Sequence, residues 1–187
     1  MNRQISHDEL LYQISQTLGK NKVIELTAIL HHQKFDLADL LSITLYPEKQ
    51  IAFRAAWIME NLYFVDLLRF VDVIDTIIAN FLIITNQSCQ RHYSKILIHL
   101  TGKKADKVIK AKLLQTDLEP IAERCFDFLI DPAAPIAVKV FAMELAFNLR
   151  ARYDWIPTML AEQIRILVTI GGPGIRSRGL RLLKQLT

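Results

Sequence analysis

Helices that begin near a proline and carry an apolar stripe recur along this chain, and this recurrence constrains the fold more than any other feature. The three clearest copies are PEKQIAFRAAWIMENL (47–62), PAAPIAVKVFAMELAF (132–147) and GGPGIRSRGLRLLKQL (171–186). In the first copy, apolar residues return at the spacing of helical turns from Ile51 to Leu62. Proline is tolerated in a first helical turn, where its missing N–H costs nothing. The alternation typical of half-buried strands is hard to find, so the pattern predicts an all-α protein.

The same periodicity predicts about ten helices joined by short turns. Ser6 and Glu9 form a capping-box pattern, so the first helix should run from about residue 7 to Leu18, with Gly19 ending it. Further helices are expected after a cap at Asn21, around 35–45, over 47–62, over 67–81 after a cap at Asp66, over 87–100, 117–129, 135–150 and 157–170, and from Pro173. The Lys-rich stretch TGKKADKVIKAK (101–112) is poorly patterned and is interpreted as a connector.

The predicted helix from Pro135 differs from the others because nearly every residue in it is apolar. A helix that is apolar all round has to be covered on several sides. We therefore expect Val140 and Met143 to be almost inaccessible to solvent.

Composition indicates a folded protein. The chain has 187 residues, 51% of them hydrophobic and 22% charged, which excludes a disordered chain and fits a single domain over 1–187.

The longest apolar stretch, 73–84, is interrupted by Asp75 and falls short of the roughly 20 residues that a membrane span needs. The N-terminus lacks the pattern of a secretory signal, and Cys89 and Cys125 are expected to be buried thiols. These features predict a cytoplasmic protein without a membrane partner.

Aligning the proline-led helices brings basic residues to similar places. Pro47 with Pro132 matches Arg54 to Lys139, the final helix adds Arg178, and Arg91 fits a fourth copy loosely. The four basic positions lie 37, 48 and 39 residues apart. This spacing is close to the roughly 40–47-residue period of HEAT and armadillo units.

With these features the chain resembles the HEAT/armadillo superfamily of stacked helix pairs. In HEAT units an acid often precedes the second helix and a basic residue follows within it, and Asp131 and Lys139 match that outline. Tyr46 and Gly172 stand where the other two copies would have the acid. The resemblance implies a right-handed α-α superhelix, with N-terminal capping helices over 1–34 and repeat-like pairs over 35–187.

Two roles are open for the basic residues of the repeat. Arg54, Lys139 and Arg178 could bridge neighbouring units, which is the favoured interpretation, or they could contact a ligand. In the bridging role, Arg178 would bond an acid or a backbone carbonyl in the preceding unit, and Arg181 would be exposed.

No residue pattern predicts a catalytic, cofactor or metal site. His31 and His32, or Cys89 with His92 and His99, lack the ligand number and spacing of zinc sites. The stretch IGGPGIRSR (170–178) lacks the ending of a phosphate loop and a preceding strand, so it is interpreted as a turn that leads into the last helix.

Positive charge gathers in the second half of the chain. Residues 1–93 carry 8 Lys and Arg against 10 Asp and Glu, whereas residues 94–187 carry 15 against 9. Aromatic residues lie near several of the cations, so both kinds of side chain could line one groove. The candidate partner-binding residues are Arg54, Trp57, Lys139, Arg150, Arg152, Trp155, Arg176, Arg178 and Arg181.

Two functions are compatible with this pattern. The leading hypothesis is a non-enzymatic helical-repeat scaffold that binds a protein or peptide through its concave face. The alternative is a DNA-binding or base-repair protein similar to the HEAT-like alkylpurine DNA glycosylases, using the basic C-terminal half. The catalytic acid of those enzymes has no counterpart that we can place in this sequence.

Overall fold

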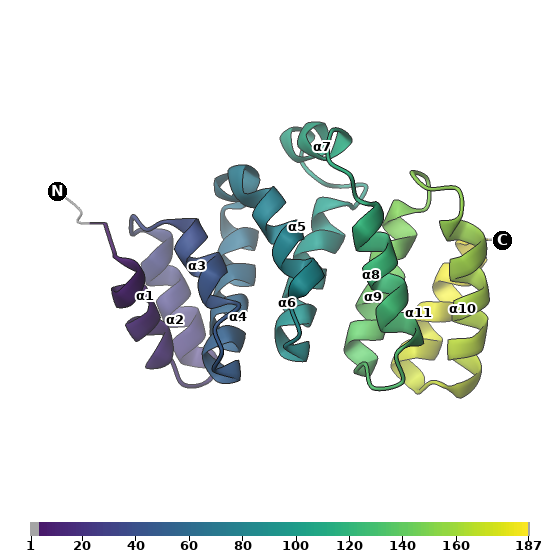
Figure 1. Cartoon of the computed structure of the whole chain (residues 1–187), viewed down its shortest axis with the longest axis horizontal. Helices are drawn as coiled ribbons and strands as arrows, with labels where there is room; N and C mark the ends of the chain where they lie inside the picture. Colours follow the sequence, from purple (N-terminus) through teal and green to yellow (C-terminus); the bar gives the residue numbers. More distant parts are fainter. Residues whose placement is uncertain (1–3, 187) are drawn as a thin grey trace. The chain divides into compact units, whose positions relative to one another are not determined.

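The structure, a computed structural model, describes residues 4–186, and within that range it contains helices and no strand (Figure 1). The helices are α1 (His7–Ser15), α2 (Gly19–His31), α3 (Leu37–Ile43), α4 (Lys49–Val65), the 3-10 helix η1 (Leu67–Val73), α5 (Ile74–Ile83), α6 (Gln87–Leu100), α7 (Lys107–Leu114), α8 (Glu119–Ile130), α9 (Ile136–Leu149), α10 (Ile156–Ile170) and α11 (Pro173–Leu186). The predicted all-α class is confirmed. The right-handed sense of the superhelix stays a prediction.

The chain divides into two compact units between Ile96 and Leu97. Helix α6 crosses this boundary. In unit 1, α3 packs against α4, α1 packs on both of them, and α2 packs on α4. In unit 2, α8 packs against α9 and α10 against α11, and α9 also contacts both helices of the following pair. The prediction of a single domain with capping helices over 1–34 stays a prediction.

Helix α9 is the central element of unit 2. Met143 is fully buried, as predicted, because α8, α10 and α11 cover its helix from several sides. The prediction for Val140 was wrong, since this residue is only half-buried. Val138 takes the inner position instead, and Ile136 at the start of the helix is 56% exposed. The uniform apolar composition of α9 left no polar side that would have marked the outward direction.

The boundaries near the N-terminus differ in part from the expectation. Ser6 does cap α1, because its Oγ accepts a hydrogen bond from the Glu9 N–H over 3.3 Å. Helix α1 ends at Ser15, earlier than predicted, and Gly19 begins α2 with a φ of +82°. Gly19 therefore supplies a left-handed turn into the second helix and does not end the first one, as the sequence had suggested. Asn21, the predicted cap, lies inside α2.

The predicted helix over 67–81 is split in two. Residues Leu67–Val73 form the 3-10 helix η1, and α5 follows directly from Ile74. The carboxylate of Asp66, which precedes η1, accepts no cap hydrogen bond from this helix, so the predicted cap is wrong. The predicted apolar face persists, because Phe70 and Phe81 are both buried.

The stretch interpreted as a connector contains α7. The Asp106 carboxylate caps this helix by accepting the Val108 N–H over 2.8 Å, and Ile109 and Leu113 are buried one turn apart. The lysines obscured this short apolar pair.

Both cysteines are buried free thiols, as expected. Burial raises the pKa of Cys89 to about 12 and also raises the pKa of Cys125, so both thiols stay protonated at neutral pH. Across residues 4–186, none of the helices is both long enough and apolar enough to cross a membrane.

Candidate binding groove

Unit 2 contains a groove between α9, α11 and the turn that follows α6, with a cavity volume of about 370 Å³. Its lining residues combine cations, amides and apolar side chains. They are Thr101, Lys103, Glu144, Phe147, Asn148, Arg150, Ala151, Arg181, Leu182 and Gln185. Three candidate residues from the sequence therefore meet at or beside this groove, namely Arg150, Arg181 and the adjacent Arg178.

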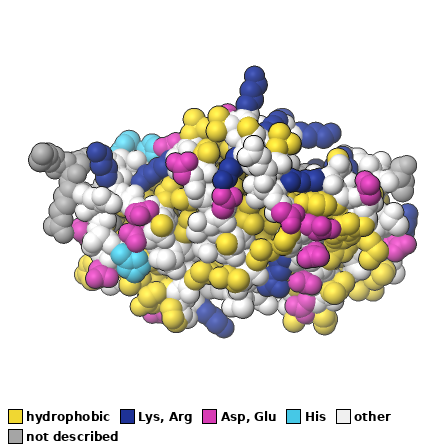
Figure 2. Space-filling model, turned by 45° about the horizontal axis from the view of Figure 1, so that its top comes forward, with side chains coloured by type: hydrophobic (Ala, Val, Ile, Leu, Met, Phe, Trp, Pro, Cys, Tyr) yellow, Lys and Arg dark blue, Asp and Glu magenta, His cyan; other side chains and the backbone are white. Residues whose placement is uncertain are grey.

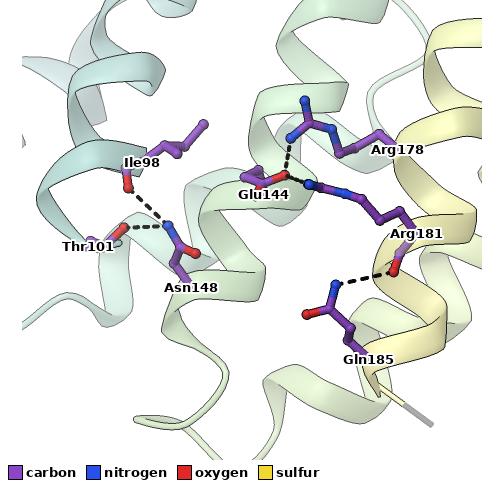
Figure 3. Close-up of polar contacts among 7 residues, drawn as sticks. All are labelled: Ile98, Thr101, Glu144, Asn148, Arg178, Arg181 and Gln185. Atoms are coloured by element: carbon purple, nitrogen blue, oxygen red, sulfur yellow. Dashed lines mark hydrogen bonds and ion pairs between the residues drawn. The ribbon is translucent and has the colours of Figure 1, made fainter. Parts of the chain in front are cut away.

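Glu144 joins α9 to α11 at one end of the groove (Figure 3). Its Oε2 atom accepts hydrogen bonds from Arg178 Nη1 and from Arg181 Nη2, the latter over 2.5 Å. Arg178 and Arg181 reach the same oxygen because residues three apart lie on one side of a helix. One carboxylate thus neutralises only one of two guanidinium groups.

These three side chains differ in exposure. The Glu144 side chain is 18% exposed, Arg178 is 34% exposed and Arg181 is 53% exposed. The predicted contact of Arg178 with an acid of the preceding helix pair is confirmed. The expectation that Arg181 is exposed is also confirmed, but Arg181 shares the acid with Arg178, which the sequence did not indicate.

Amide side chains lie along the wall of the groove. Asn148 Nδ2 donates to the Ile98 carbonyl over 3.0 Å and to Thr101 Oγ1 over 3.1 Å, which joins α9 to the end of α6. The amide oxygen of Asn148 points away from these two acceptors (Figure 3). Gln185 Nε2 donates to the Arg181 carbonyl over a long 3.5 Å.

The floor of the groove is apolar. Phe147 and Leu182 are both buried. The guanidinium carbon of Arg150 lies 3.6 Å from the centre of the Phe147 ring, and Arg150 Nη1 donates to the Phe147 carbonyl over 2.7 Å. This cation–π contact holds the Arg150 charge at the edge of the groove. Lys103, Arg150, Arg178 and Arg181 against Glu144 leave an excess of positive charge.

Two candidates, Arg54 and Trp57, lie in unit 1, and each makes its own structural contacts. Arg54 Nη1 donates to the Ser15 carbonyl over 2.8 Å, which fastens α4 to the end of α1. The Trp57 ring lies 5.6 Å from the ring of Phe53 and 6.2 Å from that of His92. Arg54 and Trp57 do not line the groove of unit 2, so the shared groove that the sequence suggested does not include them.

Two further candidates hold the elements around α7 and α8. Arg152 donates to the Leu113 carbonyl over 2.7 Å and also to the Thr116 carbonyl, so it binds the C-terminal end of α7. Trp155 Nε1 donates to Glu119 Oε1 over 2.8 Å, and its ring packs against Phe126.

Lys139 is half-buried and Arg176 is exposed. Between positions 4 and 186, neither side chain makes a hydrogen bond or an ion pair. The bridging role predicted for Arg54 and Arg178 therefore has no parallel at Lys139.

The sequence interpretation missed a second acid-centred cluster, which lies in unit 1. The Glu60 carboxylate of α4 accepts from His92 Nδ1 and, over 2.8 Å, from Lys95 Nζ, both on α6. Burial alone would raise the pKa of Glu60, but hydrogen bonds from His92 and Lys95, with their charges, lower it below the ordinary value. His92, considered above as a metal ligand, is thus bonded to a carboxylate.

The two clusters share a sequence signal. Each acid follows a methionine, at Met59–Glu60 and Met143–Glu144, and its cationic partners occur 32 to 37 residues later in the chain. Aligning the repeats on Glu60 and Glu144, and not on their basic residues, would have indicated both clusters. In residues 4–186, no group of three or more His, Cys, Asp or Glu side chains is placed to hold a metal ion.

Helix pairs stacked on one another and joined by contacts about one repeat apart define a helical-repeat protein. A family model of the HEAT repeat domain matches residues 10–185. The chain therefore belongs to the HEAT repeat domain family, as its resemblance to that superfamily predicted. Neither the curated proteins nor the solved structures include a significant match to it.

Proposed function

We propose that this HEAT-repeat protein is a non-enzymatic scaffold that binds an acidic segment of a protein or peptide in the groove of unit 2. The observation that carries the proposal is the positive excess of this groove above an apolar floor. The groove lies on α9 and α11, the second helices of their pairs. The family resemblance predicts that such helices line the concave face of the repeat array.

The chemistry of the groove suits an extended acidic peptide. Arginine binds carboxylates through two parallel N–H groups, and Arg181 has donors to spare because only its Nη2 is bonded to Glu144. Asn148 and Gln185 offer amides that could pair with a peptide backbone.

The nucleic-acid alternative has less support. Three of the arginines on which it depends already serve internal acceptors. Arg150 bonds the Phe147 carbonyl, Arg152 bonds the end of α7, and Arg178 bonds Glu144. A surface that follows a nucleic-acid backbone needs several such side chains free to bond phosphates. The proposed acidic segment needs direct bonds only from Arg181, with the other cations acting through their charge.

A fluorescein-labelled peptide of alternating Glu and Gly residues tests the proposal by fluorescence anisotropy. We expect the peptide to bind, with an affinity that falls as salt screens the charges. Arg181→Gln should weaken binding several-fold, whereas Arg165→Gln, which removes an exposed arginine from α10, should not. Equal affinities of the two variants, or no binding of the peptide, would refute the groove as the binding site. Displacement of the peptide by duplex DNA at physiological salt would favour the nucleic-acid alternative.

A further inference from the structure

Along the chain, helix α7 follows α6 and precedes the helix pairs of unit 2, and it belongs to neither pair. Its inner side is fixed to the unit, because Ile109 and Leu113 are buried and Arg152 bonds the Leu113 carbonyl. The helix therefore presents its other side in a set orientation. Little conformational entropy would be lost if that side bound a partner.

The outer side of α7 and the turn before it are basic. Lys103, Lys104, Lys107 and Lys110 are all exposed. Basic side chains, drawn in dark blue for Lys and Arg alike, project at the top of Figure 2. Lys110 Nζ donates to the Lys103 carbonyl over 2.7 Å, which ties the turn to the helix. Within residues 4–186, the other three ammonium groups have no hydrogen-bond or ion-pair partner.

Two large apolar side chains accompany these lysines. Val108 is 52% exposed and Leu114 is 79% exposed. The one acid in the helix cap, Asp106, already accepts the Val108 N–H. A basic segment with exposed apolar residues combines the two kinds of group that bind a lipid–water interface.

We propose that α7 and the turn before it attach this protein to the surface of an anionic lipid bilayer. The lysines are attracted to acidic headgroups, while Val108 and Leu114 enter the boundary between headgroups and acyl chains. This site adjoins the groove of unit 2, because Lys103 lies at the edge of both, whereas Lys104, Lys107 and Lys110 do not line the groove. Attachment of this kind is reversible and needs no membrane span, and it departs from the expectation, based on the sequence, that the protein has no membrane partner.

A lipid surface fits these residues better than a nucleic acid does. A phosphate backbone would pair with the lysines but would leave Val108 and Leu114 in water. The outer side of α7 carries no aromatic or arginine side chain on which a base could stack. The lysines act as point charges, which suits a diffuse field of headgroups.

Co-sedimentation with lipid vesicles tests this proposal on the full chain. We expect binding to phosphatidylcholine vesicles that contain about one third phosphatidylserine, and little binding to pure phosphatidylcholine. Lys104→Gln with Lys107→Gln, two changes outside the groove of unit 2, should weaken binding about 25-fold, since each lysine near an anionic surface contributes about a factor of five. Lys20→Gln with Lys34→Gln removes the same charge from exposed positions of unit 1 and should leave binding nearly unchanged.

Leu114→Ser separates the lipid proposal from attraction by charge alone. We expect this variant to keep the melting temperature of the parent and to lose several-fold in vesicle binding. The proposal is wrong if the parent does not bind the anionic vesicles, or if it binds both kinds of vesicle equally. It is also wrong if the parent prefers duplex DNA, with the same lysine dependence and no effect of Leu114→Ser.

Discussion

The Glu144 carboxylate of α9 accepts a hydrogen bond from the Arg178 guanidinium of α11, 34 residues later in the chain. In unit 1, the Glu60 carboxylate of α4 accepts one from the Lys95 ammonium of α6, 35 residues later. In both units an acid on one helix is therefore held by a cation on a helix about one repeat later in the chain. These bonds help to set how consecutive helix pairs align.

Arg178→Ala should lower the free energy of unfolding by about 1–3 kcal/mol, because it removes a charge-assisted hydrogen bond from the mostly buried Glu144. Arg181→Ala should cost about 0.5 kcal/mol, since Arg181 is more exposed and Arg178 still satisfies the acid. Chemical denaturation measures both effects, with Arg165→Ala as the control on α10. Equal losses for Arg178→Ala and Arg181→Ala would contradict the structural role assigned to Arg178.

The Glu60 cluster should make the protein sensitive to acid. The pKa of Glu60 is lowered in the folded state from its ordinary value of 4.5, since the bonds and charges of His92 and Lys95 outweigh the effect of burial. A carboxyl group with a lowered folded-state pKa stabilises the protein above its unfolded pKa, and this contribution is lost as the pH falls through the folded value.

We therefore expect the free energy of unfolding to fall more steeply below about pH 4.5 in the parent than in Glu60→Gln. Thermal unfolding followed by circular dichroism at a series of pH values measures the difference. Parallel pH profiles for the two proteins would show that the charge of Glu60 contributes nothing. Glu48→Gln, an exposed change in the same region, serves as the control.

Gly179→Ala should destabilise the packing of α11 on α10. A Cβ atom at Gly179 would lie 2.6 Å from Val168 Cγ1 and 2.9 Å from Ile164 Cγ2, so these β-branched side chains would have to move. Overpacking of this kind costs about 1–3 kcal/mol, which exceeds the gain of about 1 kcal/mol from the higher helix propensity of alanine.

The matched control for this prediction is Gly174→Ala near the start of α11. A Cβ atom there would meet only Ile136 Cγ2, at an ordinary 3.8 Å. We expect a lower melting temperature for Gly179→Ala and an unchanged or higher one for Gly174→Ala. A stabilised Gly179→Ala protein would mean that α10 and α11 can separate without cost.

Met143→Asp should abolish folded protein, because Met143 is fully buried in α9 and an unpaired charge there is very costly. Val140→Asp places the same charge on the same helix at a half-buried position, and the protein should remain folded with reduced stability. Soluble yield and far-UV circular dichroism distinguish the two variants. Similar behaviour of both would mean that α9 is less enclosed than the structure indicates.

Local patterns were enough to predict the fold class. Apolar residues at helical spacing, prolines in first turns and the cap at Ser6 act within a few residues, so they can be read from the sequence directly. The resemblance of the proline-led copies to HEAT repeats was equally accessible. The short helix α7 escaped prediction because only Ile109 and Leu113 mark its buried side among lysines.

The sequence by itself also located the positive charge in the C-terminal half, including Arg150, Arg178 and Arg181. Only the tertiary structure decided which of these cations share a groove and which ones serve internal acceptors. Glu144 meets Arg178 because α11 packs on α9, and Arg152 meets the end of α7 across 39 residues of chain. Such pairings depend on how helices stack, and stacking is set by the summed packing of many apolar side chains, which no local spacing contains.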